Sequence, residues 1–297
     1  MINSKKNPIV YFIKDITPDN ILKIYDALGR KAEGRVCVKL STGEPGNNYH
    51  LAPNLIGPLV KMINGTIVEC NTAYEGGRDH TEDHLHAAAE HGFTAIAPVE
   101  ILDANGEIAL PVNGGKHLTE NYVGKGWEKY DFTVVLSHFK GHPMAGFGGA
   151  MKNISIGMAS SAGKCWIHSA GKYRDQSNTW ANIPQDTDFQ ESMAEASKSV
   201  IDRAGDKILY ISVANNLSVD CDCVAEPEAP KMGDIGIFAS LDPVALDKAC
   251  VDAVRQSPDP GKVHLLERID SRCGLWNLEY AEQIGAGIQN YELITIA

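Results

Sequence analysis

One glycine-rich segment concentrates the residues best suited to chemistry. It runs from residue 137 to residue 168 and contains three histidines and three lysines: His138, Lys140, His142, Lys152, Lys164 and His168. Histidine titrates near neutral pH and binds metals as neutral imidazole, and a lysine among apolar neighbours can become a nucleophile or a cofactor anchor. A single loop histidine is most often merely solvated. The whole cluster favours a functional site, because sites concentrate in loops at strand ends.

A second candidate lies at the start of a helix expected near residue 81. His80 and His84 are four residues apart, so their imidazoles could share a metal ion. A polar helix start, in which Glu82 and Asp83 complement the helix dipole, explains the same residues equally well. Arg78 could bind a carboxylate through two hydrogen bonds or form an ordinary surface salt bridge.

The cysteines predict reduced thiols. Seven cysteines, an odd number, are scattered through a long chain, unlike the dense even frameworks of small secreted domains. Cys221 and Cys223 could chelate a soft metal or form a redox pair, with Cys250 and Cys273 as further thiolate candidates. Buried inert thiols are the alternative, because the repeated Cys-x-x-Cys spacing of iron–sulfur clusters is absent.

Two motifs that would indicate nucleotide binding are incomplete. Residues 157–165 suggest a phosphate-binding loop. However, Met158 stands where that motif needs its first glycine, and Cys165 stands where it needs Ser or Thr. The dinucleotide fingerprint beginning at Gly146 has Met151 at its third glycine. The sequence therefore supports neither NTP nor NAD binding.

Composition favours a small-molecule or protein partner. The net charge of −11 and the pI near 5.4 argue against nucleic-acid binding, which depends on clustered Lys and Arg. No stretch approaches the roughly 18–20 apolar residues of a membrane helix. No export signal is evident at the N-terminus, so we expect a cytoplasmic protein that does not bind membranes.

The pattern of elements predicts an α/β fold with a mostly parallel sheet flanked by helices. Short apolar runs predict strands at residues 9–13, 35–40, 66–70, 132–136, 207–213, 235–239 and 292–296. Helical periodicity and caps predict helices at 17–29, 53–63, 81–91, 189–204, 242–254 and 275–284. An Asn-Gly turn predicts a hairpin at 101–110.

The chain is expected to form two domains. Residues 141–171 are rich in glycine and lack a long periodic segment, and residues 173–188 are polar like a connection. We therefore expect an N-terminal α/β domain at 1–172, which carries the glycine-rich site loop, and a smaller C-terminal α/β domain at 173–297.

Several motifs resemble the family catalogued as domain of unknown function 362. They are Glu44-Pro45-Gly46-Asn47, His138-x-Lys140-Gly141-His142, the run from Ala145 to Asn153, Cys221-x-Cys223 and the stretch from Asp234 to Cys250. Many relatives carry a ferredoxin-like insert with cysteine-rich iron–sulfur motifs. The corresponding region here, residues 173–188, has no cysteine, so a ferredoxin-type cluster is not expected.

The stretch from Gly141 to Lys152 is also similar, more distantly, to the nickel-pincer lactate racemases. That resemblance implies a two-domain architecture in which Lys152 anchors a pincer nucleotide beside Gly146, Gly148, Gly149 and Asn153. It also implies that His168 ligates nickel, that His142 is an acid/base, and that Arg78 or Lys39 holds a substrate carboxylate. His80 is the nearest substitute for the family's other acid/base histidine, and His138 and Lys140 are further catalytic and substrate-binding candidates. Asp247 and Cys250 stand where that family has Gln and Lys.

Three functions remain open from the sequence. The first is a metal- or cofactor-assisted enzyme, a racemase, epimerase or oxidoreductase, acting on a small hydroxylated acid. The second is an iron–sulfur or metal-binding redox accessory protein that uses Cys221 and Cys223. The third is a non-catalytic ligand-binding protein. The substrate, the metal and the oligomeric state are not specified by the sequence.

Overall fold

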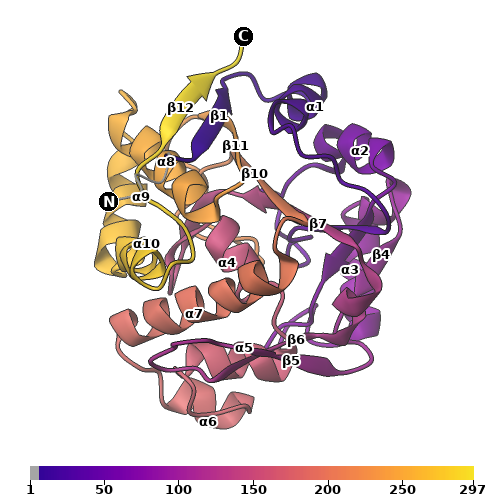
Figure 1. Cartoon of the computed structure of the whole chain (residues 1–297), viewed down its shortest axis with the longest axis vertical. Helices are drawn as coiled ribbons and strands as arrows, with labels where there is room; N and C mark the ends of the chain where they lie inside the picture. The colour runs from indigo at the N-terminus through magenta and orange to yellow at the C-terminus, as the bar shows by residue number, and fades with distance from the viewer. Residues whose placement is uncertain (1–6) are drawn as a thin grey trace, which may run out of the picture.

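The computed structural model describes residues 7–297, in which strands and helices alternate (Figure 1). Residues 1–6 lie outside the described residues. They belong to the N-terminal segment in which we expect no export signal. The strands are β1 (Ile9–Ile13), β2 (Val36–Lys39), β3 (Thr66–Glu69), β4 (Val99–Ile101), β5 (Glu107–Pro111), β6 (Glu120–Gly124), β7 (Phe132–His138), β8 (Lys140–His142), β9 (Gly146–Gly148), β10 (Ile208–Ala214), β11 (Gly236–Ser240) and β12 (Glu292–Thr295). The α-helices are α1 (Pro18–Ala27), α2 (Pro53–Met62), α3 (Thr81–Glu90), α4 (Ala150–Ile154), α5 (Ser161–His168), α6 (Gln176–Ala181), α7 (Asp186–Ala204), α8 (Pro243–Gln256), α9 (Lys262–Ser271) and α10 (Gly274–Gln283).

One large sheet organises the described residues. Its eight strands follow the order β12-β1-β11-β10-β7-β2-β3-β4. Within residues 7–297 all of them run in one direction except β11, which is antiparallel to both β1 and β10. The predicted α/β class with a mostly parallel sheet is confirmed.

Helices cover both faces of this sheet. Because successive side chains of a strand point to opposite faces, Val134 and Leu136 of β7 face one core while Val135 faces the other. The first core includes α1 and α2, and the second includes α4, α7, α8, α9 and α10. Strands buried on both faces explain the near-continuous apolar runs in the sequence.

The sheet does not divide at the expected domain boundary between residues 172 and 173. Strand β7 lies before that boundary and pairs in parallel with β10, which lies after it. The core that contains α4 also contains α8 and α10. The two parts of the chain therefore share one sheet and one set of packed helices.

Three local predictions were wrong. The expected hairpin at 101–110 does not form, because β4 pairs with β3 and β5 pairs with β6. The glycine-rich segment 141–171 is not irregular: it forms the β8–β9 hairpin and helices α4 and α5. Helix α9 was not expected at all.

Capping residues account for the helix starts that were predicted well. The hydroxyl oxygen of Thr17 accepts the backbone N–H of Asn20 at the start of α1. The carboxylate of Asp242 accepts the N–H groups of Val244 and Ala245 at the start of α8. Such caps satisfy donors that a helix leaves unpaired, so they fix where the helix begins.

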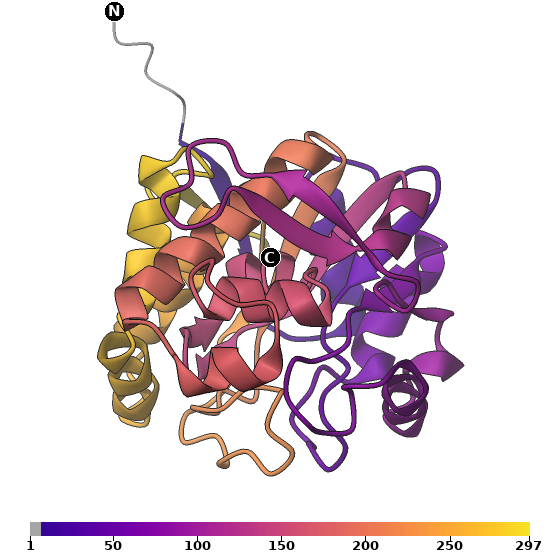
Figure 2. The same ribbon diagram turned by 90° about the horizontal axis from the view of Figure 1, so that it is seen from below.

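The carboxyl ends of the parallel strands share one edge of the sheet. Figure 2 shows the loops that follow β2, in purple, and β10, in orange, extending together at the lower edge. The backbone N–H of Glu44 donates to the carbonyl oxygen of Asp222 over 2.8 Å, which joins these two loops. In open α/β sheets this edge is where ligands bind.

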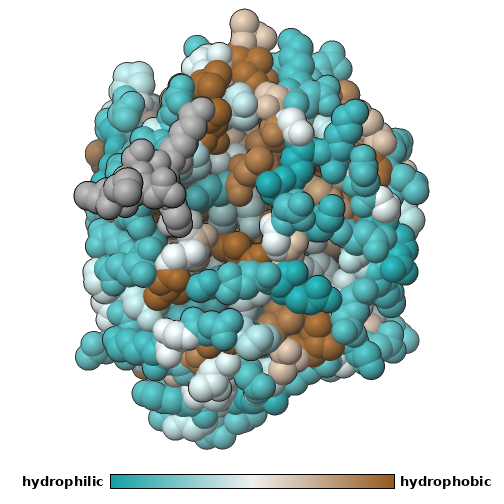
Figure 3. Space-filling model, viewed as in Figure 1, coloured by the Kyte–Doolittle hydropathy of each residue, from teal (hydrophilic) through white to brown (hydrophobic). Residues whose placement is uncertain are grey.

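The outer surface mixes hydrophilic residues with smaller hydrophobic patches, as the face in Figure 3 illustrates. Among residues 7–297, no helix combines the length and the apolar character needed to cross a membrane.

A buried carboxylate fixes the short helix α4. Asp247 of α8 accepts the backbone N–H groups of Ala150 and Met151 over 2.7 and 2.9 Å. A side chain at Gly149 would place its Cβ 2.4 Å from the Asp247 carboxylate, so glycine is needed there. Asp247 therefore sets the position of the backbone that carries Lys152.

We expect Asp247→Ala to lower the free energy of unfolding by about 2 kcal/mol, because two buried N–H groups lose their acceptor. Urea unfolding followed by circular dichroism measures the change. The control is Asp206→Ala, which removes an exposed carboxylate and should change stability by less than about 0.5 kcal/mol. Equal effects of the two substitutions would contradict the anchoring role of Asp247.

Candidate functional site

A cavity of about 290 Å³ opens at the carboxyl ends of the central strands. Its walls come from residues at the ends of β2, β3 and β7, from the β8–β9 hairpin and α4, and from the loop after β10. The cavity therefore lies at the edge where the strand directions predict a ligand site.

Most of the site residues predicted from the sequence line this cavity. They are Lys39, Arg78, His138, Lys140, His142, Gly148, Gly149, Lys152, Asn153, His168, Cys221 and Cys223. Gly146 and His80 do not. Gly146 has φ +79°, and a Cβ there would lie 2.9 Å from the Ile269 carbonyl oxygen, so it packs against the start of the α9–α10 connection.

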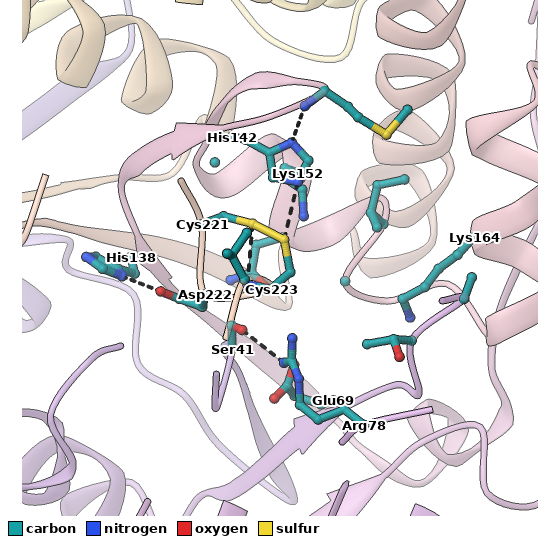
Figure 4. Close-up of a pocket in the computed structure, with 18 of the residues that line it drawn as sticks. Ser41, Glu69, Arg78, His138, His142, Lys152, Lys164, Cys221, Asp222 and Cys223 are labelled. Carbon is teal, nitrogen blue, oxygen red and sulfur yellow. Dashed lines mark hydrogen bonds and ion pairs between the residues drawn. A yellow bond between two sulfur atoms is a disulfide. The ribbon is translucent and has the colours of Figure 1, made fainter. Parts of the chain in front are cut away.

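Lys152 extends from α4 into the cavity and is half-buried (Figure 4). Among residues 7–297, no hydrogen-bond acceptor or carboxylate partner of its Nζ is found. Burial, together with the positive charges of Lys140 and Lys39, lowers the pKa of Lys152 to about 7. A substantial fraction of this amine is therefore unprotonated and nucleophilic at neutral pH.

Two other cavity cations are neutralised by the protein itself. Nε of Arg78 donates to Glu44 over 2.9 Å, and its Nη1 lies 3.5 Å from Glu69. Nζ of Lys140 pairs with Asp222. Burial would raise the pKa of Glu69, but Arg78 holds it well below its ordinary value. Arg78, predicted to bind a substrate carboxylate, thus has carboxylates of its own.

Lys39 and Lys164 have only neutral acceptors. Nζ of Lys39 donates to the Leu40 carbonyl over 2.7 Å and to Asn153 Oδ1 over 3.0 Å. Nζ of Lys164 donates to the Ala159 carbonyl over 2.6 Å. Burial lowers the pKa of Lys39 to about 8. A lysine ammonium has three donors, so these side chains keep capacity for a negatively charged ligand.

His142 is held in one orientation by backbone donors. The N–H groups of Met144 and Ala145 donate to its Nδ1 over 3.1 and 2.9 Å. Burial, reinforced by Lys152, lowers the pKa of His142 well below its ordinary value, so the ring is neutral. A neutral ring that accepts at Nδ1 carries its proton on Nε2, which lies 3.8 Å from Cys223 Sγ.

His168 has the opposite arrangement. Its Nδ1 donates to the Lys164 carbonyl over 2.7 Å, which leaves the lone pair of Nε2 without a partner among residues 7–297. The ring stacks on Phe189, and burial lowers its pKa to about 4. A neutral histidine whose Nδ1–H is held by a carbonyl is the usual form of a metal ligand.

His138 is a structural residue of the site. Its Nδ1 lies 2.9 Å from Asp222 Oδ1 and its Nε2 lies 2.6 Å from the Asn215 carbonyl oxygen. Both ring nitrogens face acceptor atoms of the protein itself, so neither is free to contact a ligand. This position does not suit the catalytic role expected for His138.

The pair His80 and His84 does not converge. The His80 side chain is 79% exposed, whereas His84 is buried with Nε2 3.3 Å from Glu69 Oε1. His84 lies outside the cavity and supports Glu69, which is consistent with a polar helix start rather than a shared metal site.

The expectation of reduced thiols is wrong for one pair. Cys221 and Cys223 form a disulfide on the cavity wall, so neither sulfur is a thiolate available to a metal in this state (Figure 4). Cys37, Cys70, Cys165 and Cys250 are buried free thiols, and Cys273 is an exposed one. Burial raises the pKa of Cys250 well above its ordinary value, in keeping with an inert thiol.

Sequence reasoning missed the carboxylates and one lysine of the site. Glu69 ends β3, so a polar residue at the carboxyl end of a predicted strand was the available signal. Asp222 is a buried counterion, and Lys140 and His138 lower its pKa below the ordinary value despite burial. Lys164 belongs to the glycine-rich cluster but was not assigned to the ligand pocket.

The fold and the site together define an α/β protein with a lysine-lined pocket at the carboxyl edge of a mostly parallel sheet. The chain belongs to the family described as Domain of unknown function (DUF362), whose model matches residues 36–252. The family predicted from the sequence motifs is confirmed. A comparison with curated proteins finds no match.

Two solved structures are similar at low identity. The lactate racemase apoprotein from Thermoanaerobacterium thermosaccharolyticum is 16% identical with a TM-score of 0.42, over 68% of this chain and 50% of that one. A Thermotoga maritima protein solved by a structural genomics consortium is 14% identical with a TM-score of 0.44, over 80% of this chain and 58% of that one. The chain thus spans about half the length of these proteins.

We expect Lys152 to react with trace acetic anhydride far faster than ordinary lysines. With its pKa at about 7, about nine-tenths of the amine is neutral at pH 8, against well under a hundredth for an exposed lysine of pKa near 10.4. The labelling rate should rise through pH 7 and level off above it. Peptide mass spectrometry with Nα-acetyl-lysine as internal reference measures this. A Lys152 curve that follows the reference would contradict the lowered pKa.

Proposed function

We propose that this chain is an enzyme that converts a small hydroxylated carboxylic acid, with Lys152 as the amine that holds a cofactor covalently. The observation that carries the proposal is the Lys152 amine: it opens into the cavity, has no partner among the described residues, and has a pKa lowered to about 7. A structural lysine would be paired or exposed, because an unpaired buried ammonium is costly. Lysines in such surroundings form covalent bonds with electrophiles.

Charge and size support a small acid as the substrate. Glu44, Glu69 and Asp222 balance Arg78 and Lys140, whereas Lys39 and Lys164 lack a carboxylate partner. The excess of positive charge favours an anion. A volume of about 290 Å³ lies at the lower end of small-ligand sites.

The donor set fits a covalently held, metal-bearing nucleotide of the pincer type that the sequence resemblance implies. Lys152 would hold the group through its amine, and His168 would ligate the metal through Nε2, which is free while Nδ1–H is bound to the Lys164 carbonyl. When bound, such a group supplies a hydride acceptor next to the substrate. Glycines at positions 148 and 149 leave the cavity wall beside Lys152 free of side chains.

The chain's own residues divide the remaining work. Lys39 and Lys164 orient the substrate carboxylate through their remaining N–H donors. His142 presents Nε2–H to the cavity and therefore donates a hydrogen bond to a substrate oxygen, which stabilises negative charge that develops there. This differs from the acid/base role expected for His142, because its Nδ1 lone pair is already used by backbone N–H groups.

The covalent role of Lys152 is tested on protein purified anaerobically from its native source. We expect intact-mass and peptide analysis to find an adduct on Lys152, together with bound metal by elemental analysis. Lys152→Arg keeps a positive charge but should lose the adduct and reduce hydroxy-acid interconversion by about 100-fold or more. Lys125→Arg, at an exposed position, is the control. Unmodified Lys152 in active protein would overturn the proposal.

Substrate class is tested separately by calorimetry on cofactor-free protein. A 2-hydroxy acid should bind, whereas the corresponding amide, which lacks the negative charge, should bind at least about tenfold more weakly. Lys39→Met should weaken the acid by about tenfold or more, the scale of one lost charged hydrogen bond, and leave the amide unchanged. Equal affinities of acid and amide would argue against a carboxylate substrate.

A further inference from the structure

The Cys221–Cys223 disulfide lies in the ligand cavity, beside a histidine. Both sulfur atoms belong to cavity-lining residues, and Cys223 Sγ is 3.8 Å from Nε2 of His142 (Figure 4). The role proposed for Lys152 makes no use of this bond. A disulfide that only stabilised the fold would not need to face a small-molecule pocket.

We propose that Cys221 and Cys223 form a dithiol–disulfide centre that exchanges with small thiols carrying carboxylate groups. The proposal goes beyond the proposed function, because it needs neither a cofactor on Lys152 nor a hydroxy-acid substrate. It requires only the cavity, the two sulfur atoms and the charges around them.

The two sulfur atoms differ in access. Cys223 is partly exposed, whereas Cys221 is buried. A thiolate that enters the cavity therefore attacks Cys223 Sγ and releases the sulfur of Cys221. The backbone N–H of Cys223 donates to Cys221 Sγ over 3.3 Å, so the released thiolate has a hydrogen-bond donor in place.

His142 serves the other sulfur. Its Nδ1 is occupied by two backbone N–H groups, so the ring proton is on Nε2 and faces Cys223 Sγ. When a second thiolate attacks the incoming group's sulfur in the mixed disulfide, Cys223 leaves as a thiolate next to this donor. A hydrogen bond to the leaving sulfur speeds such an exchange.

The peptide that carries both sulfurs is anchored independently of the disulfide. Asp222, between them, binds His138 over 2.9 Å and Lys140 as well. Its carbonyl oxygen accepts the Glu44 N–H, and Asn47 Nδ2 donates to the Val224 carbonyl over 2.8 Å. The two thiols therefore stay close after reduction, and the disulfide can form again.

The exchange balances without a further oxidant. In the first step a substrate sulfur bonds to Cys223 and the Cys221–Cys223 bond breaks. In the second step another substrate thiolate attacks the first substrate sulfur, the bond between that sulfur and Cys223 breaks, and Cys223 leaves as a thiolate. Two thiols have then lost two electrons to become one disulfide, and the cysteine pair has gained those electrons and the two protons. The reverse direction reduces a substrate disulfide.

Positive charge selects the thiol. Lys39 and Lys164 face the same cavity without carboxylate partners, so a thiol with carboxylates is attracted and a cationic thiol is repelled.

The test compares mercaptosuccinate with cysteamine, at equal thiolate concentrations, on the folded oxidised protein. Timed alkylation and peptide mass spectrometry count the new thiols. We expect two new labelled sites, Cys221 and Cys223, and reduction about tenfold faster with mercaptosuccinate. Cys273→Ser removes the exposed free thiol and should leave both rates unchanged. Reduction only after denaturation, or equal rates with both thiols, would overturn the proposal.

Single substitutions test which sulfur is attacked. With oxidised glutathione, Cys221→Ser should form a mixed disulfide at position 223, whereas Cys223→Ser should form none at the buried position 221. The reverse pattern would overturn the assigned order of attack. Lys152→Arg separates this proposal from the preceding one, because it should abolish the cofactor adduct and leave thiol exchange measurable. If the disulfide is only structural, the unaltered protein should carry the Lys152 adduct and show no thiol exchange.

Discussion

Positive charge held away from water is the constraint on which this molecule depends. Four lysines and one arginine line a single cavity, and an unpaired buried charge costs several kcal/mol. Glu44, Glu69 and Asp222 come from three separate loops or strand ends to balance part of it. The remaining charge is the basis of the proposed preference for anions. The ion pairs of the site thus join the loop after β2 to the loop after β3, and the loop after β10 to β8.

The fold was largely predictable because its main signals are local. Strands buried on both faces give apolar runs, and Thr17 and Asp242 cap helices where the sequence predicted them. Strand pairing is not local. The turn at 104–106 suggested a hairpin, but β4 joins β3 in the large sheet while β5 pairs with β6. Helix α9 begins at Lys262, and Gly261 before it has no side chain to cap the helix, so its start gave no sequence signal.

The candidate site was also predictable where the signals are local and not where they depend on contacts between distant parts of the chain. Lys152, His142 and His168 come from one segment, so the sequence could name them together as candidates, and all three line the cavity. Their protonation could not be predicted, because it depends on contacts with the Met144 and Ala145 amides and the Lys164 carbonyl. Nor could the partners of Arg78 and Lys140, which come from distant parts of the chain. The roles of Arg78 and His138 changed for this reason: substrate binding was expected of Arg78 and catalysis of His138, but tertiary contacts supply both side chains with internal partners.

The position of β1 has a consequence for how the chain acquires its structure. β1 hydrogen-bonds only to β11 and β12 within the described sheet, and both lie near the other end of the chain. During synthesis the first strand therefore emerges long before either neighbour exists. It must remain unpaired, with its apolar side chains Val10 and Ile13 uncovered, until β11 and β12 have been synthesised. Such high sequence separation slows folding and leaves a β-edge open to other chains, which makes the nascent polypeptide a natural client for chaperones.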